Sequence, residues 1–185
     1  MAPSRRILLG GLGAAAAVTV APLPAVAAPP PRLTTFVVEG SDASVALLPG
    51  ATATVLLHVV RRFHYEIAPV GLGDVRPSRS GTALVVHPHR FPAGARGGLF
   101  PHELAVVRDI LADCAGTVRW GGDDRDDPCE GLFRITTSPH DRVLARTAGR
   151  LGGTVTGSPP DPFSPVRRRA ARDLADRQAT GKDPW

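Results

Sequence analysis

The chain has 185 residues, a hydrophobic content of 43% and a formal net charge of +5, which suit one globular domain with appendages. The excess of basic over acidic residues lies at the two ends, and no basic run is interleaved with aromatic side chains. This distribution excludes the composition typical of a single-strand nucleic-acid binder, so we predict no nucleic-acid partner.

Residues 1–28 have the features of an export signal. The pair Arg5-Arg6 precedes a Gly/Ala-rich run, and Ala25-Val-Ala27 places small residues at the spacing of a signal-peptidase site. Paired arginines before such a run are typical of a twin-arginine signal, and an ordinary secretory signal is the alternative. The run is also shorter than the ~20 apolar residues of a membrane span. We predict cleavage near residue 28, an exported protein of extracellular or cell-wall location, and no stable membrane span.

Residues 29–153 alternate between strand-like and helix-like patterns. Runs rich in β-branched and aromatic residues predict strands at 34–39, 82–87, 117–120 and 132–136. Apolar residues at three- and four-residue intervals predict an amphipathic helix over 52–67. Further helices are predicted for 101–114 and 138–152, each with a proline in its first turn. These elements indicate a single α+β domain.

Residues 154–185 differ in composition from the domain. The segment contains the Pro-rich run Ser158-Pro-Pro-Asp-Pro162 and continues as a charged stretch, in which residues 167–178 contain few apolar side chains. Such a composition does not offset the entropy that ordering would cost. We therefore predict a Pro-rich linker followed by a charged disordered tail.

Two blocks of the domain resemble a known family. The first is Ser80-Gly-Thr-Ala-Leu-Val-Val-His-Pro-His-Arg-Phe-Pro92, and the second combines Thr117-Val-Arg-Trp-Gly-Gly-Asp123 with Cys129-Glu-Gly-Leu-Phe-Arg-Ile135. With the helix over 52–67, they resemble the core of the M15-type zinc D-Ala-D-Ala carboxypeptidases and cell-wall endopeptidases. The resemblance implies an M15 peptidase (Hedgehog/DD-peptidase-like) fold, an α+β architecture in which about three helices pack a single small antiparallel sheet.

This family implies a zinc site that the sequence lacks. Its members hold zinc with a His/Asp/His set and use an acidic general base. When the motif is laid on this chain without gaps, the ligand positions fall at Ser78, Val85 and Leu132, and the base falls at Cys129. Serine is a poor zinc ligand, valine and leucine have no lone pair, and one cysteine does not build a site. We predict neither a zinc cofactor nor a catalytic residue.

A different register would leave His87 and His89 as alternative metal ligands, with His102 and the acidic residues of 123–130 as partners. Two residues two apart point the same way on a strand, but Pro88 between them argues against a regular strand. A solvated loop with two exposed histidines is the simpler interpretation.

Trp120 belongs either to the core or, by the resemblance, to a substrate cleft with Gly121, Gly122 and Asp123. Core packing is the simpler interpretation for a tryptophan.

The only two cysteines, Cys114 and Cys129, suggest one disulfide in an exported protein. Two reduced thiols and a catalytic thiol are the alternatives.

The function that these observations favour is a secreted, non-catalytic M15-like cell-wall protein. Its expected partners are peptidoglycan stem peptides or a cell-wall enzyme, an inference from fold analogy alone. One alternative is an active zinc D-Ala-D-Ala carboxypeptidase or L-Ala-D-Glu-type endopeptidase with relocated ligands. The other is a decayed domain with no ligand.

Overall fold

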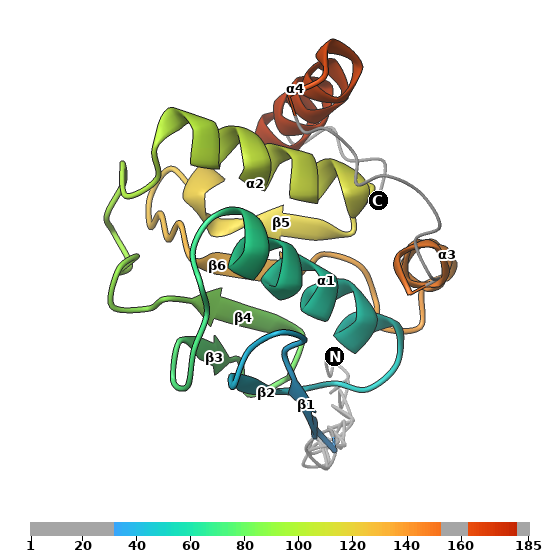
Figure 1. The fold of residues 1–185 in the computed structure, drawn as a ribbon. Coiled ribbons are helices and arrows are strands. Elements are labelled where there is room, and N and C mark those ends of the chain that lie inside the picture. Colours follow the sequence, from blue (N-terminus) through green and yellow to red (C-terminus); the bar gives the residue numbers. More distant parts are fainter. Residues whose placement is uncertain (1–31, 153–162, 181–185) are drawn as a thin grey trace, which may run out of the picture.

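The computed structural model describes residues 32–152 and 163–180, which form an α+β fold (Figure 1). The predicted export signal and most of the predicted linker lie outside these residues. The helices in the described part are α1 (Ala51–Glu66), α2 (Pro101–Asp113), α3 (Arg142–Leu151), α4 (Pro165–Ala179) and the short 3₁₀ helix η1 (Gly121–Asp123). The strands are β1 (Thr34–Val37), β2 (Ser44–Leu47), β3 (Val75–Pro77), β4 (Ala83–Val86), β5 (Val118–Trp120) and β6 (Leu132–Ile135).

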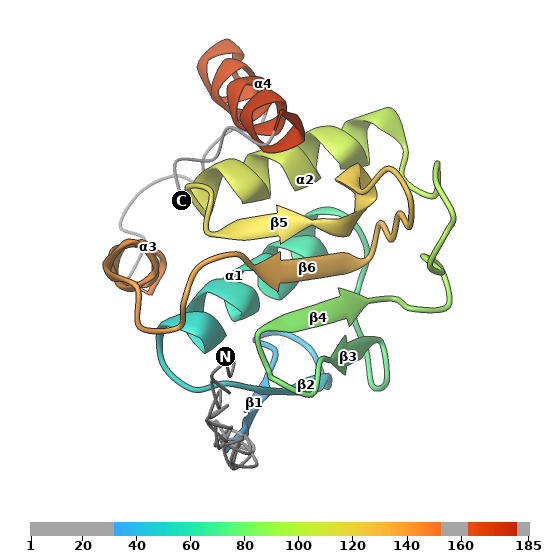
Figure 2. The ribbon, with the colours of Figure 1, turned by 180° about the vertical axis from the view of Figure 1, so that it is seen from behind.

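The described strands form two antiparallel sheets, not the single sheet that we predicted. Strands β3, β4, β6 and β5 lie side by side in that order, whereas β1 pairs only with β2 (Figure 2). The α+β class is confirmed. The sequence analysis missed β2 and β3, which have four and three residues, because runs so short give little periodicity and β3 ends in a proline.

The core lies between the four-stranded sheet and helices α1 and α2. In Figure 1, α1 crosses one face of the sheet and α2 runs along the β5 side. The predicted helix over 52–67 is confirmed as α1, and its apolar stripe is fully buried at Val55, Leu56, Val59, Val60 and Phe63. The side chains that the sheet turns toward the helices are also buried: Val75, Leu84, Val86, Val118, Trp120 and Phe133.

Helix α3 begins later than predicted. Its N-terminal cap is Asp141, whose Oδ1 accepts a hydrogen bond from the Val143 amide at 2.6 Å. Ser138, where the predicted helix begins, instead lies in a turn before the helix, and its carbonyl accepts the Asp141 amide. Aspartate is among the preferred capping residues, so the helix begins three residues later than predicted.

Helix α4 corrects the prediction of a disordered tail. Pro165–Ala179 is helical and packs on α2, so the predicted boundary at residue 154 does not separate it from the domain. Its side toward α2 buries Ala171, Leu174 and Gln178, and Gln178 Nε2 donates to the Val118 carbonyl at 3.2 Å. The small apolar area is supplemented by the ion pairs of Arg167. Composition alone does not reveal such pairs.

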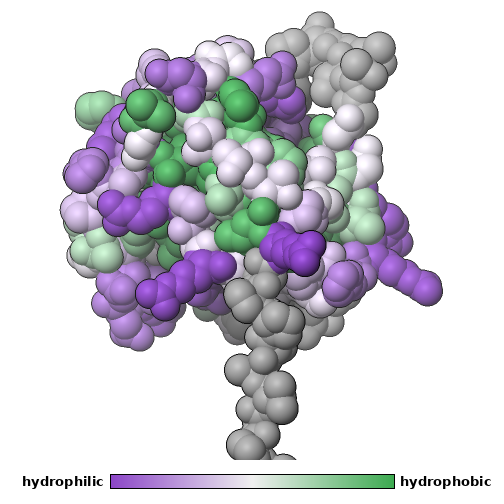
Figure 3. Space-filling model, turned by 90° about the horizontal axis from the view of Figure 1, so that it is seen from below, coloured by the Kyte–Doolittle hydropathy of each residue, from purple (hydrophilic) through white to green (hydrophobic). Residues whose placement is uncertain are grey.

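The surface seen from below in Figure 3 carries small hydrophobic patches separated by hydrophilic residues. Small separate patches are ordinary on protein surfaces. No helix in residues 32–152 or 163–180 combines the length and the hydropathy that crossing a membrane requires.

Candidate functional site

One face of the four-stranded sheet carries no described helix across it (Figure 2). Side chains alternate along each strand, so the residues between the buried ones point to this side. We call this surface the open face, and its residues are Arg76 on β3, Ala83 and Val85 on β4, Leu132 and Arg134 on β6, and Arg119 on β5. They range from half-buried to exposed.

Two of the four positions predicted for the zinc site come together at the open face, and a third lies at the end of the neighbouring hairpin. Val85 and Leu132 are direct register partners on β4 and β6, and directly opposite residues of an antiparallel pair have Cβ atoms about 4.5–5.5 Å apart. Ser78 lies at the end of the β3–β4 hairpin, where its amide donates to the Ala83 carbonyl at 2.8 Å. These positions present one hydroxyl and two alkyl groups, a set that does not fit zinc.

Cys129, the predicted base position, adjoins Leu132, whose amide donates to the Cys129 carbonyl at 3.0 Å, but the Cys129 side chain is not on the open face. It is buried, and its Sγ is 3.6 Å from the Phe91 carbonyl oxygen that accepts its hydrogen bond. The structure therefore places no carboxylate or accessible thiol at the position of a general base.

The alternative ligands His87 and His89 are not on one strand, because β4 ends at Val86. His87 has a φ of 45°, and its Nδ1 lies 3.3 Å from Asp74 Oδ1, whereas His89 is exposed. Across the part of the chain that the structure describes, no group of three or more His, Cys, Asp or Glu side chains could hold a metal ion. The relocated metal site gains no support from this arrangement.

The Trp-Gly-Gly-Asp motif forms a packed corner rather than a cleft wall. Trp120 is 4% exposed, and its Nε1 donates to the Glu130 carbonyl at 2.7 Å. A Cβ at Gly122 would overlap the indole ring, and one at Gly121 would lie 2.6 Å from the Cys129 carbonyl oxygen. The core interpretation of Trp120 is confirmed, and both glycines are there for close packing.

Asp123, the fourth predicted cleft residue, forms an ion pair with Arg108. The two side chains form two hydrogen bonds of 2.6 and 2.5 Å, and the Arg108 guanidinium lies 4.9 Å from the centroid of the Trp120 ring. This pairing holds α2 on the corner and leaves Asp123 little capacity for a substrate.

The predicted disulfide is wrong, because both cysteines are free and buried. Cys114 ends α2 and its carbonyl accepts the Thr117 amide, whereas the Cys129 amide donates to Gly121. Thr117 and Gly121 lie at opposite ends of β5, and four residues of extended chain span about 13 Å. The two cysteines are therefore held at opposite ends of this strand. Burial, followed by repulsion from Asp113, raises the pKa of the Cys114 thiol to about 12, so this thiol is not a nucleophile.

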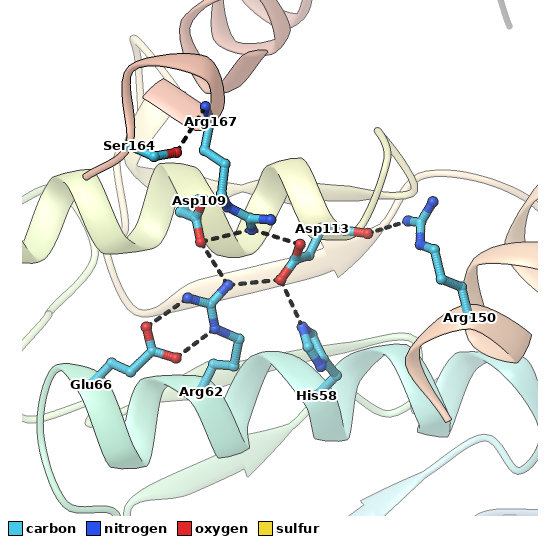
Figure 4. Close-up of polar contacts among 8 residues, drawn as sticks. All are labelled: His58, Arg62, Glu66, Asp109, Asp113, Arg150, Ser164 and Arg167. Atoms are coloured by element: carbon cyan, nitrogen blue, oxygen red, sulfur yellow. Dashed lines mark hydrogen bonds and ion pairs between the residues drawn. The ribbon is translucent and has the colours of Figure 1, made fainter. Parts of the chain in front are cut away.

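A buried ion network joins α1, α2 and α4 (Figure 4). Arg62 Nη1 lies 2.9 Å from Asp109 and 2.8 Å from Asp113, and Arg167 Nη2 lies 2.9 and 2.7 Å from the same two carboxylates. The remaining donors of Arg62 bind Glu66. We call these five residues the ion network.

Asp113 also has contacts from two residues outside the ion network. His58 Nε2 lies 3.5 Å from Asp113 Oδ2, and Arg150 donates to the Asp113 carbonyl. Burial by itself would raise the pKa of Asp113, but His58, Arg167 and Arg62 outweigh it and hold that pKa well below its ordinary value. Asp113 therefore stays ionised inside the fold.

The sequence analysis missed the ion network. The available signal was the position of Arg62, three residues after Val59 and so on the apolar side of α1, together with two acids one turn apart on α2. No local pattern shows that these two helices face each other.

Comparison with known proteins adds no assignment: no family model, curated protein or solved structure matches this chain. The arrangement of the open face is therefore the basis on which a function can be argued.

Proposed function

We propose that this chain is an exported, non-catalytic relative of the M15 zinc peptidases that binds peptidoglycan stem peptides on its open face. The observation that carries the proposal is the register of β4 and β6. Val85 and Leu132 stand where the resemblance expects two metal ligands, are far apart in sequence, and are direct partners on one uncovered surface. A shared metal would require this proximity, and a scaffold that has lost its ligands would retain it.

The chemistry of these positions favours binding over catalysis. Without a donor set for zinc there is no metal-bound water of lowered pKa. Without a carboxylate at position 129, general-base assistance worth roughly 10²–10⁴-fold is absent as well. What remains is a partly apolar strip, Ala83, Val85 and Leu132, with arginines beside it. Such a strip suits the methyl groups and carboxylates of an alanine-containing peptide.

Sedimentation with purified peptidoglycan sacculi tests the binding. We expect the mature protein to sediment with sacculi, to release no D-alanine and to retain no stoichiometric zinc after dialysis. Val85→Lys, which places a charge in the middle of the open face, should abolish sedimentation. Leu72→Lys, at a loop residue that is 81% exposed, is the matched control and should behave as wild type. Failure of the wild-type protein to sediment would contradict the proposal, as would chelator-sensitive release of D-alanine.

Restoring the ligands tests the M15-like geometry separately. The triple variant Ser78→His, Val85→Asp and Leu132→His should bind one zinc ion, because Val85 and Leu132 are register partners and Ser78 lies at the end of the neighbouring hairpin, within reach of a histidine side chain. The double variant without Val85→Asp has one ligand fewer and should bind zinc far more weakly. A triple variant that keeps the native circular dichroism spectrum yet binds no zinc would refute the proposed placement.

A further inference from the structure

Two arginines stand directly opposite each other on the open face. Arg119 on β5 and Arg134 on β6 are register partners, and their side chains share the face that no described helix covers. Like charges at directly opposite positions of a sheet are unfavourable. The fold therefore places two cations at an unfavourable pair of positions.

Neither guanidinium group has a partner within residues 32–152 and 163–180: no hydrogen bond or ion pair joins them to another described side chain or carbonyl. Several other arginines of the same part do have such partners. Arg62 and Arg167 bind carboxylates, Arg96 binds the carbonyls of the 122–125 segment, and Arg108 binds Asp123. The pair on the open face thus has unused donors.

Asp124 is an acidic residue whose pKa is affected by the charges of both arginines. Hydrogen bonds from the Asp126 and Asp127 amides lower the pKa of its carboxyl, and the charges of Arg134 and Arg119 contribute further. Those amides lie 3.2 and 3.4 Å from Asp124 Oδ1, so the carboxylate is directed to the turn backbone. It does not neutralise the two guanidinium groups.

We propose that Arg119 and Arg134 form an anion site that binds a free carboxylate of a short peptide lying on the open face. A planar guanidinium matches a carboxylate with two parallel hydrogen bonds, and two such groups on neighbouring strands can hold one anion between them. Ala83 is the partner of Arg134 on β4, and Leu132 precedes it by two residues on β6. The site therefore suits a carboxylate next to a small alkyl group, as at an alanine residue.

Identifying that peptide as a peptidoglycan stem peptide rests on the proposed function, whereas the anion site can be tested without it. The first probe is glutarate, followed by NMR of the arginine Nε–H signals. The second is a pair of sacculi preparations, both stripped of wall phosphate polymers, one of them with its carboxyl groups amidated. Unstripped walls serve as a third arm, because a phosphate would offer the same two guanidinium groups a similar anion.

The double variant Arg119→Gln/Arg134→Gln should lower the affinity for stripped sacculi by about tenfold or more, since a hydrogen bond to a charged group is worth more than one decade in binding. Wild-type protein should bind amidated sacculi no better than this variant binds unmodified ones. Arg168→Gln, at an exposed arginine of α4 that lies outside the open face, is the control and should change the affinity by less than about twofold. Glutarate should shift the Arg119 and Arg134 signals and leave the Arg168 signal unaffected.

Arg134→Glu is a second variant for the case in which the double variant misfolds. It replaces the repulsion between the two arginines with an attraction to Arg119, so it should fold. It should still abolish glutarate binding. The anion site is refuted if the double variant binds like wild type, or if amidation changes nothing, and the proposed function then still stands. Binding to phosphate-bearing walls alone would refute the carboxylate assignment. Glutarate binding at the two arginines without sedimentation on any sacculi would uphold the anion site and reject the proposed function.

Discussion

The arginines of this molecule occupy two contrasting environments. In the ion network, Arg62 and Arg167 together contact Asp109, Asp113 and Glu66 (Figure 4). On the open face, Arg119 and Arg134 face each other with no partner among the described residues. The same side chain is thus a structural cross-link in one region and an unpaired cation in the other.

The difference follows from what burial demands. A charge taken out of water is tolerated only when counter-charges and hydrogen bonds replace the water, so the interior arginines have to be paired. A like-charge pair at a hydrated surface costs well under 1 kcal/mol, which a fold can carry. Small local costs of this kind are expected at functional positions. This contrast is why we propose a binding role for the open face and a stabilising role for the ion network.

The largest effect should come from breaking the ion network at its most buried carboxylate. Asp109 is 1% exposed and is shared by Arg62 and Arg167. Asp109→Asn leaves both guanidinium groups short of one charge, and we expect the free energy of unfolding to fall by about 3–5 kcal/mol. Urea denaturation at pH 7 measures this. Glu39→Gln, which removes the exposed pair with Arg61, is the control and should cost about 0–1 kcal/mol. A loss below that of the control would mean that the ion network is not structural.

Removing the α4 contribution should cost less. Arg167→Gln keeps the helix but loses the bonds to Asp109 and Asp113, and we expect a loss of about 2 kcal/mol because hydrogen bonds between charged groups are replaced. Since α4 buries only a few side chains, it should also become sensitive to limited proteolysis. Arg168→Gln changes the adjacent, exposed arginine and should leave the helix protected. Equal cleavage of the two variants would argue against Arg167 as the anchor of α4.

The ion network should also give the stability a dependence on acid pH. The folded pKa of Asp113 is held below its value in the unfolded chain, which is about 3.9. Its contribution is therefore fully present above about pH 4 and is lost as the pH falls toward the folded pKa. The difference in unfolding free energy between wild type and Asp113→Asn should shrink by about 1.4 kcal/mol per pH unit below pH 4. Urea midpoints from pH 6 to pH 2 test this, and a constant difference would contradict it.

How far the sequence predicts this molecule depends on whether the evidence is local. The stripe of α1 and the buried sides of β4, β5 and β6 follow from apolar periodicity, so those elements were predicted close to their observed bounds. Helix α4 was not, because Arg167 is stabilised by Asp109, a residue 58 positions away. The same dependence on distant contacts explains why the predicted disulfide was wrong. An even number of cysteines favours a bond, but the fold places β5 between the two residues.

The open face was only partly predictable for the same reason. The resemblance placed Ser78, Val85 and Leu132 in one site, and the strand register does bring Val85 and Leu132 together. Arg119 and Arg134 each lie between apolar residues of a short strand, which predicts that both point outward. Only the register of β5 on β6 shows that they are opposite each other, and register depends on the assembled sheet.

The smallest expected effect has the opposite sign and sharpens the contrast most directly. Arg134→Glu converts the like-charge pair with Arg119 into an opposite-charge pair, and opposite charges at facing positions are favourable where like charges are not. We expect the free energy of unfolding to rise by about 0.5 kcal/mol at low salt, with the gain shrinking at 0.5 M salt because exposed charges are screened. Arg76→Glu is the control, because its partner on β4 is Val85 and no repulsion is relieved. A stabilisation by Arg134→Glu that exceeds the control would mean that the wild-type chain carries a destabilising arginine pair. Equal stability of the two variants would remove the energetic argument that this pair is kept for binding.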